Sequence, residues 1–140
     1  MARGGFFSVD SLQSVHVLVV CGDAMTGELL LSVLQYCGAL CTLAGSPEEA
    51  FRRMDVLRPD VAVGCLPVDQ PQGGLAFVRQ LRARKPENGG TTPVVLVGEG
   101  FDAEPPGLGR PDAVLPHPVN PWDLCRVVST LITARGNTGP

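Results

Sequence analysis

The residues of this sequence with the greatest capacity for chemistry each stand at or just after the end of a short apolar run. They are two thiols, a carboxylate and an imidazole: Cys21, Cys65, Asp23 and His117. Thiolate, imidazole and carboxylate groups are the ligand types that zinc prefers in proteins. Two thiols can also be oxidised to a disulfide when their Cα atoms come within about 7 Å of each other. Both chemistries require a fold that brings the ends of the apolar runs together.

The sequence holds five cysteines and no CxxC pair: Cys21, Cys37, Cys41, Cys65 and Cys125. An odd number of cysteines, in a chain whose first ten residues contain no apolar signal segment, argues against a disulfide framework. We expect Cys37, Cys41 and Cys125 to be small buried hydrophobic residues. Outside the first group no Ser-His-Asp or Cys-His arrangement points to hydrolysis, so we do not expect an enzyme.

Five short runs rich in β-branched residues predict five strands, at residues 15–20, 40–44, 60–65, 93–97 and 112–115. The runs are nearly continuous in apolar character, which is typical of parallel strands covered by helices on both faces. The sequence therefore predicts a sheet that lies between two layers of helices.

Apolar residues recur at three-to-four spacing between the first two strands and predict a helix that ends at Gly38. Its expected inward face is Met25, Leu29, Leu30, Val33, Leu34 and Tyr36 or Cys37. The second helix should begin after Ser46, which can cap it, with Glu49 placed to close a capping box. The last helix should begin in the same way, with Asn120 as the cap and a proline after it.

A loop is expected at residues 67–74, and an amphipathic helix after it. Its inward face is predicted to be Leu75, Phe77, Val78 and Leu81, while Arg79, Arg82 and Arg84 are predicted to point into solvent. The segment 98–111 holds four glycines and three prolines. Because such a segment cannot form a long regular helix, the helix between the last two strands should be short or missing.

Strands that alternate with helices predict an α/β fold, here a doubly wound, five-stranded parallel sheet in the order 2-1-3-4-5, the flavodoxin-like topology. We place the domain at residues 15–135, with a flexible lead at 1–14 and a tail or the start of a linker at 136–140. The functional crevice of such a sheet lies beyond the carboxyl ends of its strands. The residues that follow the strands should therefore meet at one edge.

Composition narrows the classes of function. Hydrophobic residues make up 44% of the 140 residues, enough to build a core. The formal net charge of -3 argues against direct binding to nucleic acid. No apolar run approaches the roughly 20 residues that a membrane-spanning helix needs. We therefore expect a cytoplasmic protein that acts on neither nucleic acid nor a membrane.

Several segments, in their order and spacing, resemble the receiver domain of two-component response regulators, the CheY-like family. They are Val17–Val20 as the first strand, Gly45–Ala50 as the opening of the second helix, Arg58–Val61 as the approach to the third strand, Gly74–Arg82 as the third helix and Asp112–Val119 as the fifth strand with its X-Pro turn. The resemblance covers residues 15 to 135 and implies the receiver topology.

The resemblance also implies which positions would hold the phosphorylation chemistry. Receivers place an acidic pair after the first strand to hold Mg²⁺, an aspartate that accepts the phosphoryl group at the end of the third strand, Thr or Ser after the fourth and Lys after the fifth. The matching positions here are Cys21 and Gly22, with Asp23 one step later, then Cys65, Gly98 and His117. The expected pocket is therefore degenerate, with no catalytic residue and no cofactor.

The leading interpretation is a pseudo-receiver, a signal-transduction module that acts by phosphorylation-independent protein–protein interaction. Its partner would be a second copy of the chain, an output domain in a longer chain or another protein. One alternative is a metal-binding or redox-sensing site built from Cys21, Cys65 and His117, with Asp23 nearby, although a bound metal is not expected. Another is a regulatory domain that binds a small ligand. The remaining interpretations are a structural spacer and a pocket that relaxed into neutral residues without a function of its own.

Overall fold

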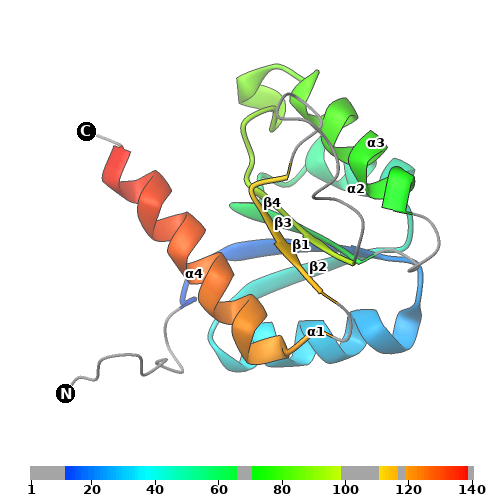
Figure 1. The fold of residues 1–140 in the computed structure, drawn as a ribbon. Coiled ribbons are helices and arrows are strands. Elements are labelled where there is room, and N and C mark those ends of the chain that lie inside the picture. The colour runs from blue at the N-terminus through cyan, green and yellow to red at the C-terminus, as the bar shows by residue number, and fades with distance from the viewer. Residues whose placement is uncertain (1–11, 66–70, 99–110, 117–118, 139–140) are drawn as a thin grey trace.

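Five parallel strands form one sheet in the order β2-β1-β3-β4-β5 in the computed structural model, which confirms the predicted topology (Figure 1). The structure describes residues 12–65, 71–98, 111–116 and 119–138. The strands are β1 (His16–Cys21), β2 (Leu40–Ala44), β3 (Val61–Cys65), β4 (Val94–Val97) and β5 (Ala113–Leu115). Each strand boundary differs from the predicted one by at most one residue.

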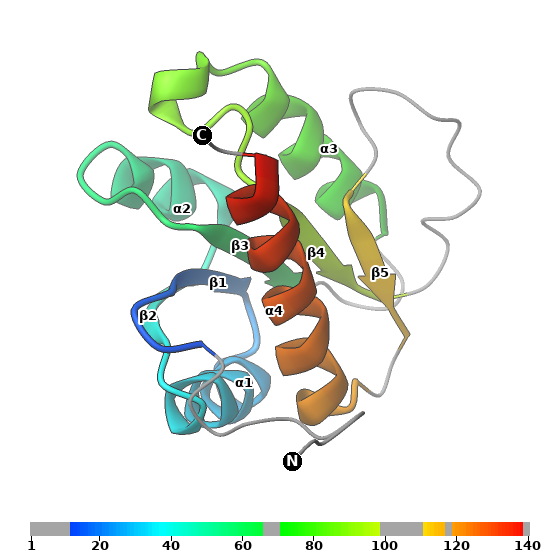
Figure 2. The ribbon, with the colours of Figure 1, turned by 90° about the vertical axis from the view of Figure 1, so that its left-hand side faces the viewer.

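Helices cover both faces of the sheet (Figures 1 and 2). One face carries α1 (Ala24–Tyr36) and α4 (Pro121–Thr138), and the other carries α2 (Pro47–Met54) and α3 (Pro71–Arg82). Side chains alternate along a strand, so Val17 and Val19 of β1 pack in the first layer while Leu18 and Val20 pack in the second. The apolar runs are continuous because each strand contributes to two cores.

Side-chain caps begin the helices where the sequence predicted them. The Ser46 hydroxyl accepts from the Glu49 backbone N–H at 3.2 Å. The Glu49 carboxylate accepts from the Gly45 N–H at 2.9 Å, one residue before the partner that a capping box would use. Asn120 Oδ1 accepts from the Trp122 N–H at 2.9 Å at the start of α4. Gly38 follows α1 with a φ of +100°, a conformation that glycine adopts without strain.

The predicted inward face of α1 is partly wrong. Leu30 and Leu34 are fully buried, and so is Cys37, the predicted alternative to Tyr36, whereas Met25 and Leu29 are exposed. Two neighbouring stripes on the surface of α1 carry apolar residues at three-to-four spacing. Periodicity alone therefore does not say which of the two stripes packs against the sheet. The stripe through Leu30 and Leu34 was selected by the packing of α1 on β1 and β2.

The flexible lead was predicted to cover residues 1–14, but Leu12 already belongs to the folded domain. This side chain is fully buried in the core beside α1 and α4. Its backbone N–H donates to the Cys37 carbonyl at 3.0 Å, just after the end of α1. The domain therefore begins three residues before the predicted boundary, because Leu12 closes one end of the apolar layer. Residues 1–11 lie outside the described part of the chain.

The observed limits of two helices also differ from the predicted ones. The α3 helix begins at Pro71, inside the segment 67–74 that was predicted to be a loop, since proline is tolerated in a first helical turn. The α4 helix continues to Thr138, into the predicted tail at 136–140. The expectation of a short or missing helix between β4 and β5 concerns residues 99–110, which lie outside the described residues.

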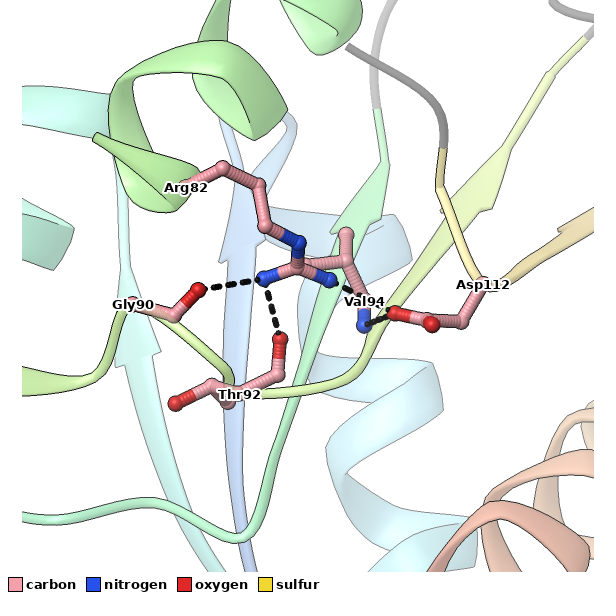
Figure 3. Close-up of polar contacts among 5 residues, drawn as sticks. All are labelled: Arg82, Gly90, Thr92, Val94 and Asp112. Carbon is pink, nitrogen blue, oxygen red and sulfur yellow. Dashed lines mark hydrogen bonds and ion pairs between the residues drawn. The ribbon is translucent and has the colours of Figure 1, made fainter. Parts of the chain in front are cut away.

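Arg82 does not point into solvent as predicted, but joins three elements at the amino-terminal edge of the sheet (Figure 3). Its Nη1 donates to the carbonyl oxygens of Gly90 and Thr92 at 3.1 and 2.7 Å, just before β4. Its Nη2 donates to Asp112 Oδ2 at 2.8 Å, and the same oxygen accepts from the Val94 N–H at 2.8 Å. The guanidinium therefore ties the end of α3 to the starts of β4 and β5.

Substitution of Arg82 should reduce the stability of the fold, because its guanidinium clamps Gly90, Thr92 and Asp112 together. Arg82→Met keeps the apolar stem but leaves two carbonyl groups and one carboxylate without their charged donor, so we expect a loss of about 2–4 kcal/mol in the free energy of unfolding, measured with urea. Arg53→Met is the matched control, because its ion pair with Glu49 is solvent-exposed and should contribute no more than about 0.5 kcal/mol. Equal losses in the two variants would contradict the clamp.

Candidate functional site

The structure brings Cys21 and Cys65 side by side at the carboxyl edge of the sheet. They are register partners, at the last positions of β1 and β3. Adjacent strands lie about 4.8 Å apart, and partners in register point to the same face. Both side chains belong to the apolar layer beneath α1 and α4, and both are about 95% buried. The two thiols therefore form a neighbouring pair.

The pKa values of the two thiols are shifted in opposite directions. A hydrogen bond from the Cys65 thiol lowers the pKa of Cys21 to about 7, against the opposing effect of burial. The same hydrogen bond, with burial and the charge on its neighbour, raises the pKa of Cys65. In its protonated form Cys21 donates to the Asp23 carbonyl at 3.3 Å. The pair thus favours a single negative charge, which is held on the Cys21 sulfur.

The first turn of α1 lies against Cys21. A Cβ atom built on Gly27 would lie 3.4 Å from the Cβ of Cys21 and 3.0 Å from Cδ1 of Leu43, so the absence of a side chain permits this close approach. Backbone hydrogen bonds at Asp23 and Gly27 also lower the pKa of the Cys21 thiol. The amino end of a helix favours a nearby thiolate in the same direction.

Asp23 caps α1 and is exposed at the same edge. Its Oδ2 accepts from the Thr26 N–H at 3.3 Å and from the Thr26 hydroxyl. The hydroxyl contact is the largest cause that holds the pKa of the Asp23 carboxyl below its ordinary value. The carboxylate is therefore engaged in starting the helix.

These residues do not fit a magnesium site. A hard cation takes six or more oxygen ligands, and neither Cys21 nor Gly22 has a side-chain oxygen to place beside the carboxylate of Asp23. No group of three His, Cys, Asp or Glu residues in the described ranges could hold a metal ion. His117, the fourth member of the predicted zinc set, lies outside the described residues.

Gly98 follows β4 at this edge and is buried. Its N–H donates to the Leu115 carbonyl at 2.8 Å, which extends the pairing of β4 with β5. Its φ of +151° is a conformation that residues with side chains rarely adopt. The position therefore supplies backbone geometry and no reactive group.

A second cysteine contact, which the sequence did not predict, joins α1 to α4. Cys37 and Cys125 are fully buried, and their Sγ atoms lie 3.7 Å apart. Burial raises the pKa of both thiols. Cys41 is half-buried, and burial raises its pKa to about 11. These three residues act as small hydrophobic groups, and no local pattern marks the contact because its members are 88 residues apart.

Comparison with known proteins defines the fold. No protein-family model matches the sequence, and no curated protein matches it. A CheY-like response regulator receiver domain from Methylobacillus flagellatus is 25% identical with a TM-score of 0.68, covering 86% of this chain and 98% of its own. The signal receiver domain of a histidine kinase from Syntrophus aciditrophicus is 21% identical with a TM-score of 0.72, covering 86% and 92%.

A third similar structure is the receiver domain of a sensor histidine kinase from Pseudomonas aeruginosa, which holds a magnesium ion in its active-site cleft. It is 22% identical with a TM-score of 0.70, covering 85% of this chain and 98% of its own. The chain therefore has the fold of response regulator receiver domains. None of the helices in the described ranges has the length and apolar character to cross a membrane.

The acidity of Cys21 can be read from its alkylation by iodoacetamide. Because the thiolate reacts and the pKa is about 7, the labelling rate should rise through pH 7 and level off above it, whereas Cys41 should stay unreactive at pH 8. Cys65→Ala removes the donor, so the midpoint should move toward the ordinary value of about 8.5. Mass spectrometry of peptides from short labelling times at each pH gives the profile. If the labelling profile of wild-type Cys21 had its midpoint near pH 8.5, about the ordinary pKa of cysteine, the proposed effect of Cys65 on the Cys21 pKa would be contradicted.

Proposed function

We propose that this domain is a receiver-like signalling module of a two-component type regulator that acts by binding a protein partner without being phosphorylated. The observation that carries the proposal is the thiol pair at the carboxyl edge, where β1 and β3 end in Cys21 and Cys65. This is the edge where we expect a receiver to hold its metal and its phosphoryl acceptor. The fold is that of a receiver, while the chemistry at its edge is different.

The described residues at this edge lack what aspartyl phosphorylation needs. An acyl phosphate requires a carboxylate, and β3 ends in the thiol of Cys65. Asp23, a carboxylate two residues after the end of β1, is engaged as the cap of α1. Lys85, the single lysine of the chain, precedes the 3-10 turn η1 (Pro86–Asn88) and lies on the amino-terminal side of β4. We infer that the domain neither transfers a phosphoryl group nor catalyses another reaction.

An exposed apolar stripe on α1 supports the binding of a protein partner. Met25, Leu29 and Tyr36 are 82%, 54% and 65% exposed, at spacings that place them on one side of the helix. The ring of Tyr36 meets the ring of Trp122 of α4 edge-on, with centroids 5.9 Å apart. Exposed apolar groups gathered in this way are typical of protein contact surfaces.

The form of the partner that we favour is a second copy of the chain, with an output domain in a longer chain as the alternative. The place of action that we infer is the cytoplasm. Five free cysteines support a reducing compartment, because disulfides are rare in the cytosol.

The absence of phosphorylation is directly testable. We expect no gain in intact mass when the protein is treated with acetyl phosphate and Mg²⁺, because no carboxylate stands at the end of β3. A phosphorylation-competent receiver treated in parallel shows that the reagent is active. A stoichiometric mass gain that disappears in Cys65→Ala would overturn the proposal.

Self-association through α1 is a separate prediction. Leu29→Glu places a charge in the middle of the stripe, so we expect the dimer to weaken by at least tenfold, about 1.4 kcal/mol, in sedimentation equilibrium. Val56→Glu is the matched control, because Val56 is also highly exposed but follows α2 on the other layer. A wild-type protein that stays monomeric at every concentration would contradict the second-copy form of the proposal.

A further inference from the structure

We propose that Cys21 and Cys65 are a thiol-oxidation site, which a peroxide converts into a reversible disulfide between β1 and β3. The first support is geometric. The two residues are direct register partners, so their Cα atoms are separated by about 4.8 Å, the spacing of adjacent strands. Disulfides join residues whose Cα atoms lie about 4.4–6.8 Å apart. Both side chains occupy the same layer, so the bond requires no change of register or face.

The second support is the difference between the two thiols. Cys21 lies against the amino end of α1 and next to the exposed residues Gly22 and Asp23. This position favours its thiolate form, in the same direction as its lowered pKa, so we assign Cys21 as the nucleophile. Cys65 stays protonated beside it and is placed to react second. A low-pKa thiol with a second thiol in contact is the arrangement of reversible cysteine oxidation sites.

The chemistry balances with hydrogen peroxide as the oxidant. The Cys21 thiolate attacks one peroxide oxygen, so an S–O bond forms, the O–O bond breaks, and the leaving oxygen departs as water after it takes up a proton. The Cys65 sulfur then attacks the resulting sulfenic acid, so the S–S bond forms and the second oxygen departs as water with the remaining proton. Two thiols lose two electrons and two protons in total, and the peroxide becomes two waters.

We do not expect the other cysteine pair to react in the same way, although its thiols are also close together. The Sγ atoms of Cys37 and Cys125 are 3.7 Å apart, yet both side chains are fully buried between α1 and α4. Burial raises the pKa of both thiols, so neither supplies a thiolate near neutral pH. We therefore expect this pair to stay reduced under conditions that oxidise Cys21 and Cys65, and it serves as an internal control.

The disulfide would act on the part of the molecule that begins α1. Cys21 is two residues from Asp23, the cap of α1, and contacts the first turn of the helix at Gly27. A bond that draws Cys21 toward Cys65 would therefore change the position of the cap relative to the sheet. The domain would receive an oxidative signal at its carboxyl edge, and this inference does not depend on the identity of the protein partner.

The test is made on the 140-residue protein. Reduced protein is exposed to a small excess of hydrogen peroxide at pH 7.5, the remaining thiols are alkylated under denaturing conditions, and the peptides are identified by mass spectrometry. We expect a peptide pair linked through Cys21 and Cys65 that has lost two hydrogens and that dithiothreitol separates. The peptides of Cys37, Cys41 and Cys125 should remain fully alkylated.

Two variants fix the order of the steps. In Cys65→Ser, dimedone should trap a sulfenic acid at Cys21, whereas in Cys21→Ser the rate of oxidation at Cys65 should fall at least tenfold. Linkage of Cys37 to Cys125 before the proposed pair, or further oxidation of Cys21 in the wild type without any linkage, would overturn the inference. The wild-type peptide map alone decides the result if either variant fails to fold.

Discussion

The register of β1 against β3 is the constraint on which the rest of the molecule depends. It pairs Val17 with Val61 at one end of the strands and Cys21 with Cys65 at the other. A slip of one residue would turn every side chain of one strand to the opposite face, and the two thiols would then lie in different layers. Register is strongly specified here because both faces are buried, so the apolar packing of the sheet also fixes the chemistry at its edge.

The two edges of the sheet are held by different interactions. At the amino-terminal edge, the guanidinium of Arg82 and the carboxylate of Asp112 satisfy backbone groups at the starts of β4 and β5. At the carboxyl edge the central strands end in thiols, and α1 approaches closely because Gly27 has no side chain. Charge therefore stabilises one end, while the other end holds a small, polarisable pair of thiols.

This domain has the fold of a receiver, but the fold does not determine the chemistry of the thiol pair at the edge of its sheet. A fold hosts the chemistry of the residues at its edge, and fold alone does not assign that chemistry. The edge of this sheet, as far as it is described, does not assemble an oxygen-rich cation site. It instead sets a thiol whose pKa is lowered to about 7 beside a thiol whose pKa is raised, and the proposed thiol oxidation rests on this difference together with the register of the two strands.

The sequence by itself determined the strands and the caps, because these depend on local patterns. It also predicted the order of the sheet, from the alternation of strands with helices and the rules for connecting parallel strands. Continuous apolar runs mark strands buried on both faces, and Ser46 and Asn120 act on backbone groups a few residues away. The same sheet order predicted that Cys21 and Cys65 would share an edge. Tertiary structure alone decided which stripe of α1 is buried, where Arg82 finds its partners, that Leu12 closes the core and that Cys37 meets Cys125. Those outcomes depend on residues far apart in the chain, and a side chain's partners are fixed only when the layers pack together.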